Sequence, residues 1–404
     1  MDENLKIFIL KDNDFQYSNN IRKRPVPILQ YLNSLSKDSN PYYVSLTKNV
    51  EDANYILFPY NLQSILGFYG YADSVKLLHS LPYFKEFEDK YIFFLDHDSS
   101  IPFHLKSLIF RTNVDSHSKD IGAISVPYVV NDLFDKTHFY LKECKYDVSF
   151  VGYIGSSKIR FSLLSNILQT KQTIRKYIKV RSKFHGDLDA KTREQNKTLF
   201  YESMRDSILV LCPAGAGKNT IRLYEIMSMG RIPVLVSDEW ILPFEDEIDY
   251  DDFVLRVKED QADIADEIIT NWFKSQSYDE LLRKCKKNRE IWQKYFSING
   301  YISQIFKILA RYKPASEVLT TTNHQTIDYQ QLRSIVKNNF LQELQNNNYA
   351  SAATYLELLF NKETLRNDLD TTQEYLECLI NIRPKLDSYI KEKCEEIIRL
   401  QSQE

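Results

Sequence analysis

The chain has little glycine, few cysteines and no long apolar run. Its 404 residues include 10 glycines and 5 cysteines, against 27 tyrosines and 23 phenylalanines. No stretch approaches the roughly 18 uncharged apolar residues of a membrane-spanning helix, so we expect no transmembrane segment. The cysteines are odd in number and lack the spacing of a metal site, which predicts free thiols in a reducing compartment: Cys144, Cys212, Cys285, Cys378 and Cys394.

An excess of either charge is also missing. The formal net charge is -3, with 26% charged and 43% hydrophobic residues, as in ordinary soluble globular proteins. This balance argues against a general polyanion binder, and the length predicts two or three domains. The acidic start, Met1 to Leu5, lacks the basic and apolar regions of a signal peptide, so we expect a cytoplasmic protein.

The most informative stretch runs from Ser207 to Phe253. Ile208–Cys212 is a short apolar run typical of a strand buried on both faces. Residues 213–217, Pro-Ala-Gly-Ala-Gly, break it; we call them the Gly loop. A helix capped by Asn219 or Thr220 should follow as far as about Met229. Next come a glycine at position 230, suited to end a helix, and a second buried strand over 232–236, which completes a strand–helix–strand unit.

A Gly-rich turn before a helix can bind an anion, because backbone N–H groups and the positive end of the helix dipole converge there. Arg222 and Glu225 share one face of this helix, with Lys218 one turn earlier. The cation suits a diphosphate, and the carboxylate suits ribose hydroxyls. The alternative is a surface ion pair worth roughly 0.2–0.5 kcal/mol. The predicted donor residues here are Gly215, Gly217, Lys218, Asn219, Thr220, Arg222 and Glu225.

The loop is not a Walker A motif. That motif needs glycine where Cys212 stands and serine or threonine where Asn219 stands, and both positions fail.

Five blocks of this stretch resemble the exostosin family of glycosyltransferases. They are Cys212–Gly217, Arg222–Glu225, Gly230–Val234, Leu242–Phe244 and Ile248–Phe253. The resemblance implies an α/β GT-B fold, with two Rossmann-like domains facing a cleft, a nucleotide-sugar donor, inversion at the anomeric carbon and no metal. The chain departs from the family at Ala214, Thr220 and Tyr250, where Arg, Ser and Trp are usual.

We therefore predict three parts. Residues 1–140 form an acceptor-side domain, 141–313 a nucleotide-sugar-binding domain, and 314–404 an all-helical extension beyond the family resemblance. The extension contains helical patterns at 328–347, 350–360, 362–382 and 384–401, the last beginning at Pro384. We expect it to serve self-association into a homo-oligomer or docking to a pathway enzyme, including peripheral association with a membrane-bound pathway.

In the first domain, strands are predicted at Lys6–Leu10 and Tyr91–Leu95 and a helix at Tyr71–His79. Asp96-His97-Asp98 follows the second strand, at the end where parallel sheets bind ligands. As an acid pair it is a metal site. As the family's His-Asp it faces the cleft, where Asp98, or His97 oriented by a carboxylate, takes the proton of the acceptor hydroxyl. We favour the second reading; in a third, Asp98 only caps a loop.

The second domain opens with a strand, a Gly-containing loop and a helix over 157–169, again suited to phosphate, and Gly152 is a predicted donor-binding residue. Arg160 in the first turn is a candidate for the donor phosphates or sugar, or else a surface cation. The basic stretch 170–197 is a rim that attracts an anionic substrate rather than a nucleic-acid face. Asp238 and Glu239 end a strand at the cleft and are candidates for the donor sugar, with Trp240 packing on base or sugar; ordinary loop roles are the alternative.

The resulting hypothesis is a hexosyl- or glycuronosyl-type transferase. It moves a sugar from a nucleotide-diphosphate donor, a UDP-sugar, to a hydroxyl of a glycan, glycolipid or polysaccharide, and it requires no cofactor. The alternatives are a catalytically inactive scaffold or glycan-binding protein and a nucleic-acid binder, of which we expect the latter least. Intact Arg222 and Glu225 favour the enzyme.

Overall fold

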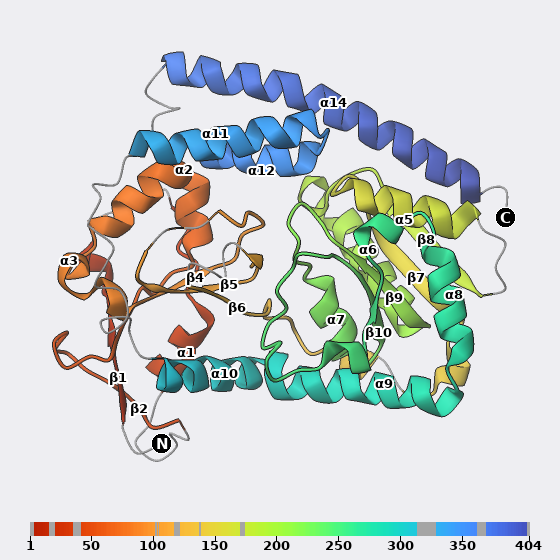
Figure 1. Cartoon of the computed structure of the whole chain (residues 1–404), viewed down its shortest axis with the longest axis horizontal. Helices are drawn as coiled ribbons and strands as arrows, with labels where there is room; N and C mark the ends of the chain where they lie inside the picture. Colours follow the sequence, from red (N-terminus) through yellow and green to blue (C-terminus); the bar gives the residue numbers. More distant parts are fainter. Residues whose placement is uncertain are drawn as a thin grey trace.

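The computed structural model describes residues 4–15, 21–34, 42–101, 103, 105–116, 122–136, 139–169, 174–312, 329–361 and 369–401. Two α/β domains, each built on a parallel sheet, stand side by side, and a layer of helices lies across both (Figure 1). This arrangement confirms the predicted fold class, two Rossmann-like domains with a helical C-terminal extension.

The first sheet has six parallel strands in the order β2-β1-β3-β4-β5-β6. Apolar helices cover both faces: α1 (Pro27–Asn33) on one, α2 (Leu62–His79) on the other, with the single-turn α3 (Phe84–Phe87) beside it. Because both faces are covered, β4 is buried throughout. The strands are β1 (Leu5–Ile9), β2 (Val44–Leu46), β3 (Tyr55–Leu57), β4 (Tyr91–Leu95), β5 (Leu108–Arg111) and β6 (Ala123–Ser125).

The second sheet has five parallel strands in the order β11-β10-β9-β7-β8. Its strands are β7 (Tyr146–Tyr153), β8 (Lys176–Arg181), β9 (Ser207–Pro213), β10 (Ile232–Val236) and β11 (Leu255–Arg256). Its helices are α5 (Lys158–Gln169), α6 (Ala190–Arg205), α7 (Arg222–Ser228), α8 (Ala265–Ser275) and α9 (Tyr278–Ile291). The strand predicted at 232–236 matches β10 at both ends, and Gly230 adopts the expected left-handed conformation, with φ 63°.

One helix returns from the second domain to the first. After α9, a π-helical turn (Trp292–Phe296) leads into α10 (Ile298–Arg311), which runs back toward α1 (Figure 1). Its buried face joins the core of the first sheet, and the Tyr55 hydroxyl donates to the carbonyl oxygens of Leu309 and Tyr312, each at 2.8 Å. The α10 helix therefore braces the first domain.

The extension closes the opposite side. Its helices are α11 (Tyr329–Gln345), α12 (Tyr349–Leu359) and α14 (Leu369–Gln401). Leu332, Val336 and Leu358 join the core of the first domain beside α2. Ile390, Cys394 and Ile397 of α14 join the core of the second domain. The extension therefore spans both domains along one edge (Figure 1).

The predicted break at Pro384 is wrong. Pro384 lies inside α14 rather than at its start. A proline removes one helical hydrogen bond. The helix nevertheless continues, and on either side of the proline it packs into hydrophobic clusters through buried Ile382 and Ile390. The Thr-rich linker predicted at 315–327 lies outside the described residues.

Within the described ranges, no helix is both long and apolar enough to cross a membrane. All five cysteines are free thiols, and four of them are buried.

The contact between α12 and α2 depends on one glycine. Gly70 has φ 72° and ψ -178°, a conformation that side chains avoid, and a Cβ there would lie 2.8 Å from the Leu358 carbonyl oxygen. The α2 helix starts well before the predicted Tyr71 because the kink at Gly70 joins two helical segments.

We expect Gly70→Ala to lower the free energy of unfolding by roughly 2–3 kcal/mol, through backbone strain and displacement of α12. Gly67→Ala is the matched control in the same helix, since nothing lies within 4 Å of its would-be Cβ. The control should raise stability by about 0.5–1 kcal/mol. Urea unfolding measures both, and equal effects of the two variants would contradict the proposed role of Gly70.

Candidate active site

A cavity of about 600 Å³ lies where the two domains and the extension meet. The first domain contributes the loops after β4 and β5, and the second the Gly loop and the start of α5. The extension contributes the turn between α11 and α12. The lining residues are Asp98–Ser100, Asn113, Asp115, Gly155–Ile159, Ala214–Lys218, Glu239, Glu259, Glu343, Asn346–Ser351, Thr354, Tyr355, Leu386 and Tyr389. Of the predicted site residues, Asp98, Gly215, Gly217, Lys218 and Glu239 are among them.

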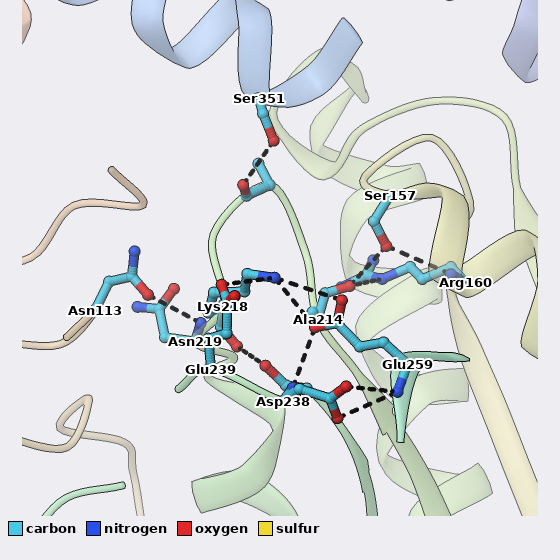
Figure 2. Close-up of polar contacts among 12 residues, drawn as sticks. Asn113, Ser157, Arg160, Ala214, Lys218, Asn219, Asp238, Glu239, Glu259 and Ser351 are labelled. Atoms are coloured by element: carbon cyan, nitrogen blue, oxygen red, sulfur yellow. Dashed lines mark hydrogen bonds and ion pairs between the residues drawn. The ribbon is translucent and has the colours of Figure 1, made fainter. Parts of the chain in front are cut away.

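The Gly loop docks directly on the first domain. A Cβ on Gly217 would lie 2.6 Å from the backbone oxygen of Asp98, so only glycine allows this approach. The Asn219 side chain donates to Thr112 Oγ1 at 3.2 Å and to the Tyr128 hydroxyl at 2.7 Å. The Asn219 backbone N–H donates to Asn113 Oδ1 at 3.2 Å (Figure 2). The loop thus forms the floor of the cavity and part of the domain interface.

The predicted helix cap is wrong. The α7 helix begins only at Arg222, its N-cap is Ile221, and no side chain caps it. Asn219 and Thr220 are buried, at 4% and 7% exposure. The amide of Asn219 is used across the domain interface, which takes it away from the helix end.

Arg222 is buried rather than part of a surface ion pair. Its guanidinium lies over the rings of Phe150 and Phe200, at 4.4 and 4.8 Å. Nη2 donates to the Val151 carbonyl oxygen at 2.8 Å, while buried Nη1 has no hydrogen-bond partner among the described residues. Gly152 makes room, since a Cβ there would lie 2.7 Å from Nη2. Burial lowers the pKa of Arg222 to about 10, so it stays charged at neutral pH.

Arg160 lies beneath the Gly loop and meets only neutral acceptors. Its guanidinium donates to the carbonyl oxygens of Ala214 at 3.2 Å and Tyr153 at 2.9 Å, and to Ser156 Oγ at 2.9 Å. Ser157 donates to the same Ala214 oxygen (Figure 2). Burial, and then the charge of Arg222, lower the pKa of Arg160 to about 9.

A third guanidinium belongs to Arg181, at the end of β8. From the sequence we predicted only that Arg181 belongs to the basic rim over 170–197. Nε and Nη1 of Arg181 are buried without a hydrogen-bond partner among the described residues. Its charge depresses the pKa of both Arg160 and Arg222. We call Arg160, Arg181 and Arg222 the guanidinium cluster; within the described chain, no salt bridge to a carboxylate neutralises any of them.

Register explains how the cluster forms. Arg181 pairs with Tyr153 across β7 and β8, Arg160 enters from the first turn of α5 after β7, and Arg222 starts α7 after β9. Carboxyl ends of parallel strands share one edge, so segments distant in sequence bring like charges together there. This arrangement is costly without a counter-anion.

Lys218 and Glu239 lie at the mouth of the cavity. Lys218 Nζ lies 3.3 Å from Glu259 and 3.5 Å from Glu239. Asp238 does not line the cavity; its carboxylate accepts from the backbone N–H of Glu259 at 3.1 Å (Figure 2). Trp240 is only 4% exposed and packs edge-on against Tyr224. The predicted contact of Trp240 with base or sugar is therefore wrong, because its ring is buried in the hydrophobic core of the second domain.

Asp96, His97 and Asp98 have three different environments. Asp96 forms an ion pair with Arg24 at 2.9 Å. His97 is buried, and its Nδ1 accepts from the Ser99 backbone N–H at 3.0 Å, so Ser99, rather than a carboxylate, holds that nitrogen. Burial lowers the pKa of His97 to about 4. Only Asp98 lines the cavity, where burial, and then the charge of Asp96, raise its pKa.

The described residues contain no group of three or more His, Cys, Asp or Glu side chains that could hold a metal ion. In the acid pair considered as a metal site, Asp96 is held by Arg24 and Thr112.

Two Rossmann-like domains facing a cavity, with a Gly loop and buried cations at the strand ends of the second, define a GT-B architecture. Residues 145–271, which lie within the second domain, match the family described as the Exostosin GT47 domain.

Curated relatives match the chain over a short stretch. A probable glucuronosyltransferase of Oryza sativa subsp. japonica is 36% identical over 90 residues, which cover 22% of this chain and 20% of the relative. A probable β-1,4-xylosyltransferase of Arabidopsis thaliana, IRX10L, is 36% identical over 77 residues, 19% of each chain. The chain thus spans about a fifth of the length of these relatives. Among solved structures, a glycosyltransferase from Rickettsia africae covers 71% of this chain and 88% of its own, with a TM-score of 0.38 and 11% identity.

Glu225 lies behind the Gly loop, outside the residues that line the cavity. Burial raises the pKa of this carboxyl to about 7, and the nearby charge of Arg222 opposes the shift. Because the folded protein holds the proton more tightly than the unfolded chain, ionisation between pH 4.5 and 7 weakens the fold.

We expect Glu225→Gln to gain stability relative to wild type as pH rises from 5 to 8. The gain is at most about 3 kcal/mol, since a tenfold change in proton affinity corresponds to about 1.4 kcal/mol. Below about pH 4.5, where the carboxyl is protonated in both states, the two proteins should be equally sensitive to pH. Denaturant unfolding at several pH values measures the difference, and a constant difference would contradict the raised pKa.

Proposed function

We propose that the chain is an inverting glycosyltransferase that moves a sugar from a nucleotide-diphosphate donor, a UDP-sugar, to a hydroxyl of a glycan or polysaccharide. The GT47 domain at 145–271 and its relatives, named as glucuronosyl- and xylosyltransferases, support this class of reaction. The guanidinium cluster carries the proposal, because it needs an anion and lies beside the Gly loop.

The cluster suits a diphosphate. Burial is the main cause of the lowered pKa values of Arg160, Arg181 and Arg222. Repulsion adds to burial for two of them, because the charges of Arg222 and Arg181 lower the pKa of Arg160 and the charge of Arg181 lowers that of Arg222. All three remain cations at neutral pH. A diphosphate bound at the Gly loop offers negative charge on several oxygens and relieves this repulsion. Backbone N–H groups of the loop and of the α5 start add dipoles of the same sign.

The same charge assists the chemistry. As the acceptor oxygen bonds to the anomeric carbon from one face, the bond to the diphosphate oxygen breaks on the other, and configuration inverts. Negative charge grows on the leaving diphosphate in the transition state, where fixed cations stabilise it more than in the ground state.

Asp98 is the proposed base. Its carboxyl lines the cavity, and its backbone touches Gly217, which places it beside the donor loop. The raised pKa of Asp98 makes it a better acceptor for the proton that the attacking hydroxyl loses. His97 is neutral and buried, and we assign it the structural role of orienting the loop after β4 through its hydrogen bond with Ser99.

The guanidinium cluster gives a test that separates binding from folding. We expect Arg181→Met to weaken UDP binding at least ~10-fold in calorimetry, since one charge-assisted contact is worth roughly 1.5–3 kcal/mol. Stability should be unchanged or higher, because the variant removes repulsion and Nε and Nη1 have no hydrogen bond to lose.

Lys179→Met, an exposed cation on the same strand, is the matched control and should alter neither quantity. GDP, ADP and CMP, each with and without chelator, test the choice of nucleotide and of a metal-free site. Loss of stability in Arg181→Met with unchanged UDP affinity would refute the donor site. The absence of binding to any nucleotide would favour an inactive scaffold.

We expect Asp98→Asn to lower the transfer rate by ~10²–10⁴-fold, the usual contribution of a positioned base, while UDP affinity stays within about twofold. Asp115→Asn, at another carboxylate lining the same cavity, is the control. Release of nucleotide from a panel of UDP-sugars with oligosaccharide acceptors measures the rate. Equal losses in the two variants would remove the special role of Asp98.

A further inference from the structure

We propose that the turn between α11 and α12 forms a carbohydrate subsite that holds the acceptor. This inference rests on the proposed function and assigns a substrate role to the extension. The subsite consists of Glu343, Asn346, Asn348, Tyr349, Thr354 and Tyr355, all of which line the cavity. These residues lie outside the GT47 match at 145–271.

The turn is built into the cavity rather than lying loosely over it. Ser351 of α12 donates to the Ala216 carbonyl oxygen of the Gly loop at 2.9 Å (Figure 2). Lys158 at the start of α5 donates to the Asn346 carbonyl oxygen. Asn347 takes the left-handed conformation, with φ 54°, that ends α11 and turns the chain. Its Oδ1 accepts from the Tyr349 hydroxyl at 3.0 Å, and Tyr349 packs against Tyr389 of α14.

The chemistry of this wall suits a neutral sugar. Among the described residues that line the cavity, those of the extension include no lysine or arginine, and Glu343 repels phosphate. In the part of the chain that the structure describes, Asn346 accepts a hydrogen bond through its backbone oxygen, and the Asn348 side chain does not cap α12. Both side-chain amides are therefore available to sugar hydroxyls, as donors and acceptors. The tyrosine rings offer apolar faces on which a sugar ring packs, with a hydroxyl at the edge.

The position favours the acceptor over the donor sugar. Leu332, Val336 and Leu358 anchor α11 and α12 in the core of the first domain, which also carries Asp98. The apolar anchors of this wall and the proposed base therefore belong to the same domain, and the Gly loop and the start of α5 of the second domain line the same cavity. An acceptor held by this wall presents its hydroxyl beside Asp98.

The test uses the full chain with Asn346→Ala and Asn348→Ala combined. The Asn346 bond uses its backbone oxygen and the Asn348 side chain caps no helix, so we expect stability unchanged. The matched control is Asn338→Ala, an exposed amide on α11 outside the cavity. The probes are an array of immobilised neutral oligosaccharides, read with and without UDP, and UDP alone in calorimetry.

We expect the wild type to bind array oligosaccharides, and the double variant to bind them at least ~10-fold more weakly, about one neutral hydrogen bond per amide, with UDP affinity unchanged. The control should match the wild type. In transfer assays the variant should raise the KM for acceptor and leave the KM for donor unchanged.

Three results would overturn the subsite: UDP binding without any oligosaccharide bound, equal oligosaccharide binding by wild type and double variant, or a rise in the donor KM alone. The first of these leaves the proposed donor site standing. Oligosaccharide binding that the variant loses, in a protein that binds no nucleotide, would support the subsite while refuting the transferase.

Discussion

The contact between the Gly loop and the first domain determines the arrangement of the site. Gly217 brings its backbone against Asp98, and Asn219 fixes the approach with bonds to Thr112 and Tyr128. These few atoms set the distance between a carboxyl on one sheet and cations on the other. A side chain at position 217 would push the Gly loop away from Asp98 and so would increase the distance between that carboxyl and the cations of the second domain. This explains why a loop that resembles a phosphate cradle also makes tertiary contacts between domains.

Much of the fold was predictable because it depends on local patterns. The buried run at 232–236 gave β10 at both ends, and Tyr91–Leu95 gave β4, since strands buried on both faces read as continuous apolar stretches. The boundaries that failed depend on distant partners. Asn219 was predicted to cap a helix, but its side chain donates to Tyr128 of the other domain instead. Pro384 was predicted to start a helix, but it lies inside α14, which packs along the two domains.

The site was predictable in part. The predicted residues Gly215 and Lys218 line the cavity, because they lie in one local motif whose spacing can be recognised in the sequence, whereas Arg222 is buried outside the cavity lining. The sequence did not indicate that Arg181 lies near Arg160 and Arg222, because that proximity depends on the pairing of β8 with β7. The extension was read as a docking module, and no pattern in its sequence shows that Asn346 and Asn348 reach the cavity. The order of segments along the chain does not show which of them meet at the same edge of the sheet in the folded protein.

The extension also bears on the catalytic cycle. Its α11 and α12 are anchored in one domain and its α14 in the other, while α10 spans the opposite side. A cleft fastened along both edges cannot open like a hinge without peeling a buried helix face away from its core. In the proposed transferase, release of the spent nucleotide would therefore require local detachment of the extension, and the buried contacts of the extension would oppose that step. The extension would then influence the rate of product release as well as the stability of the fold.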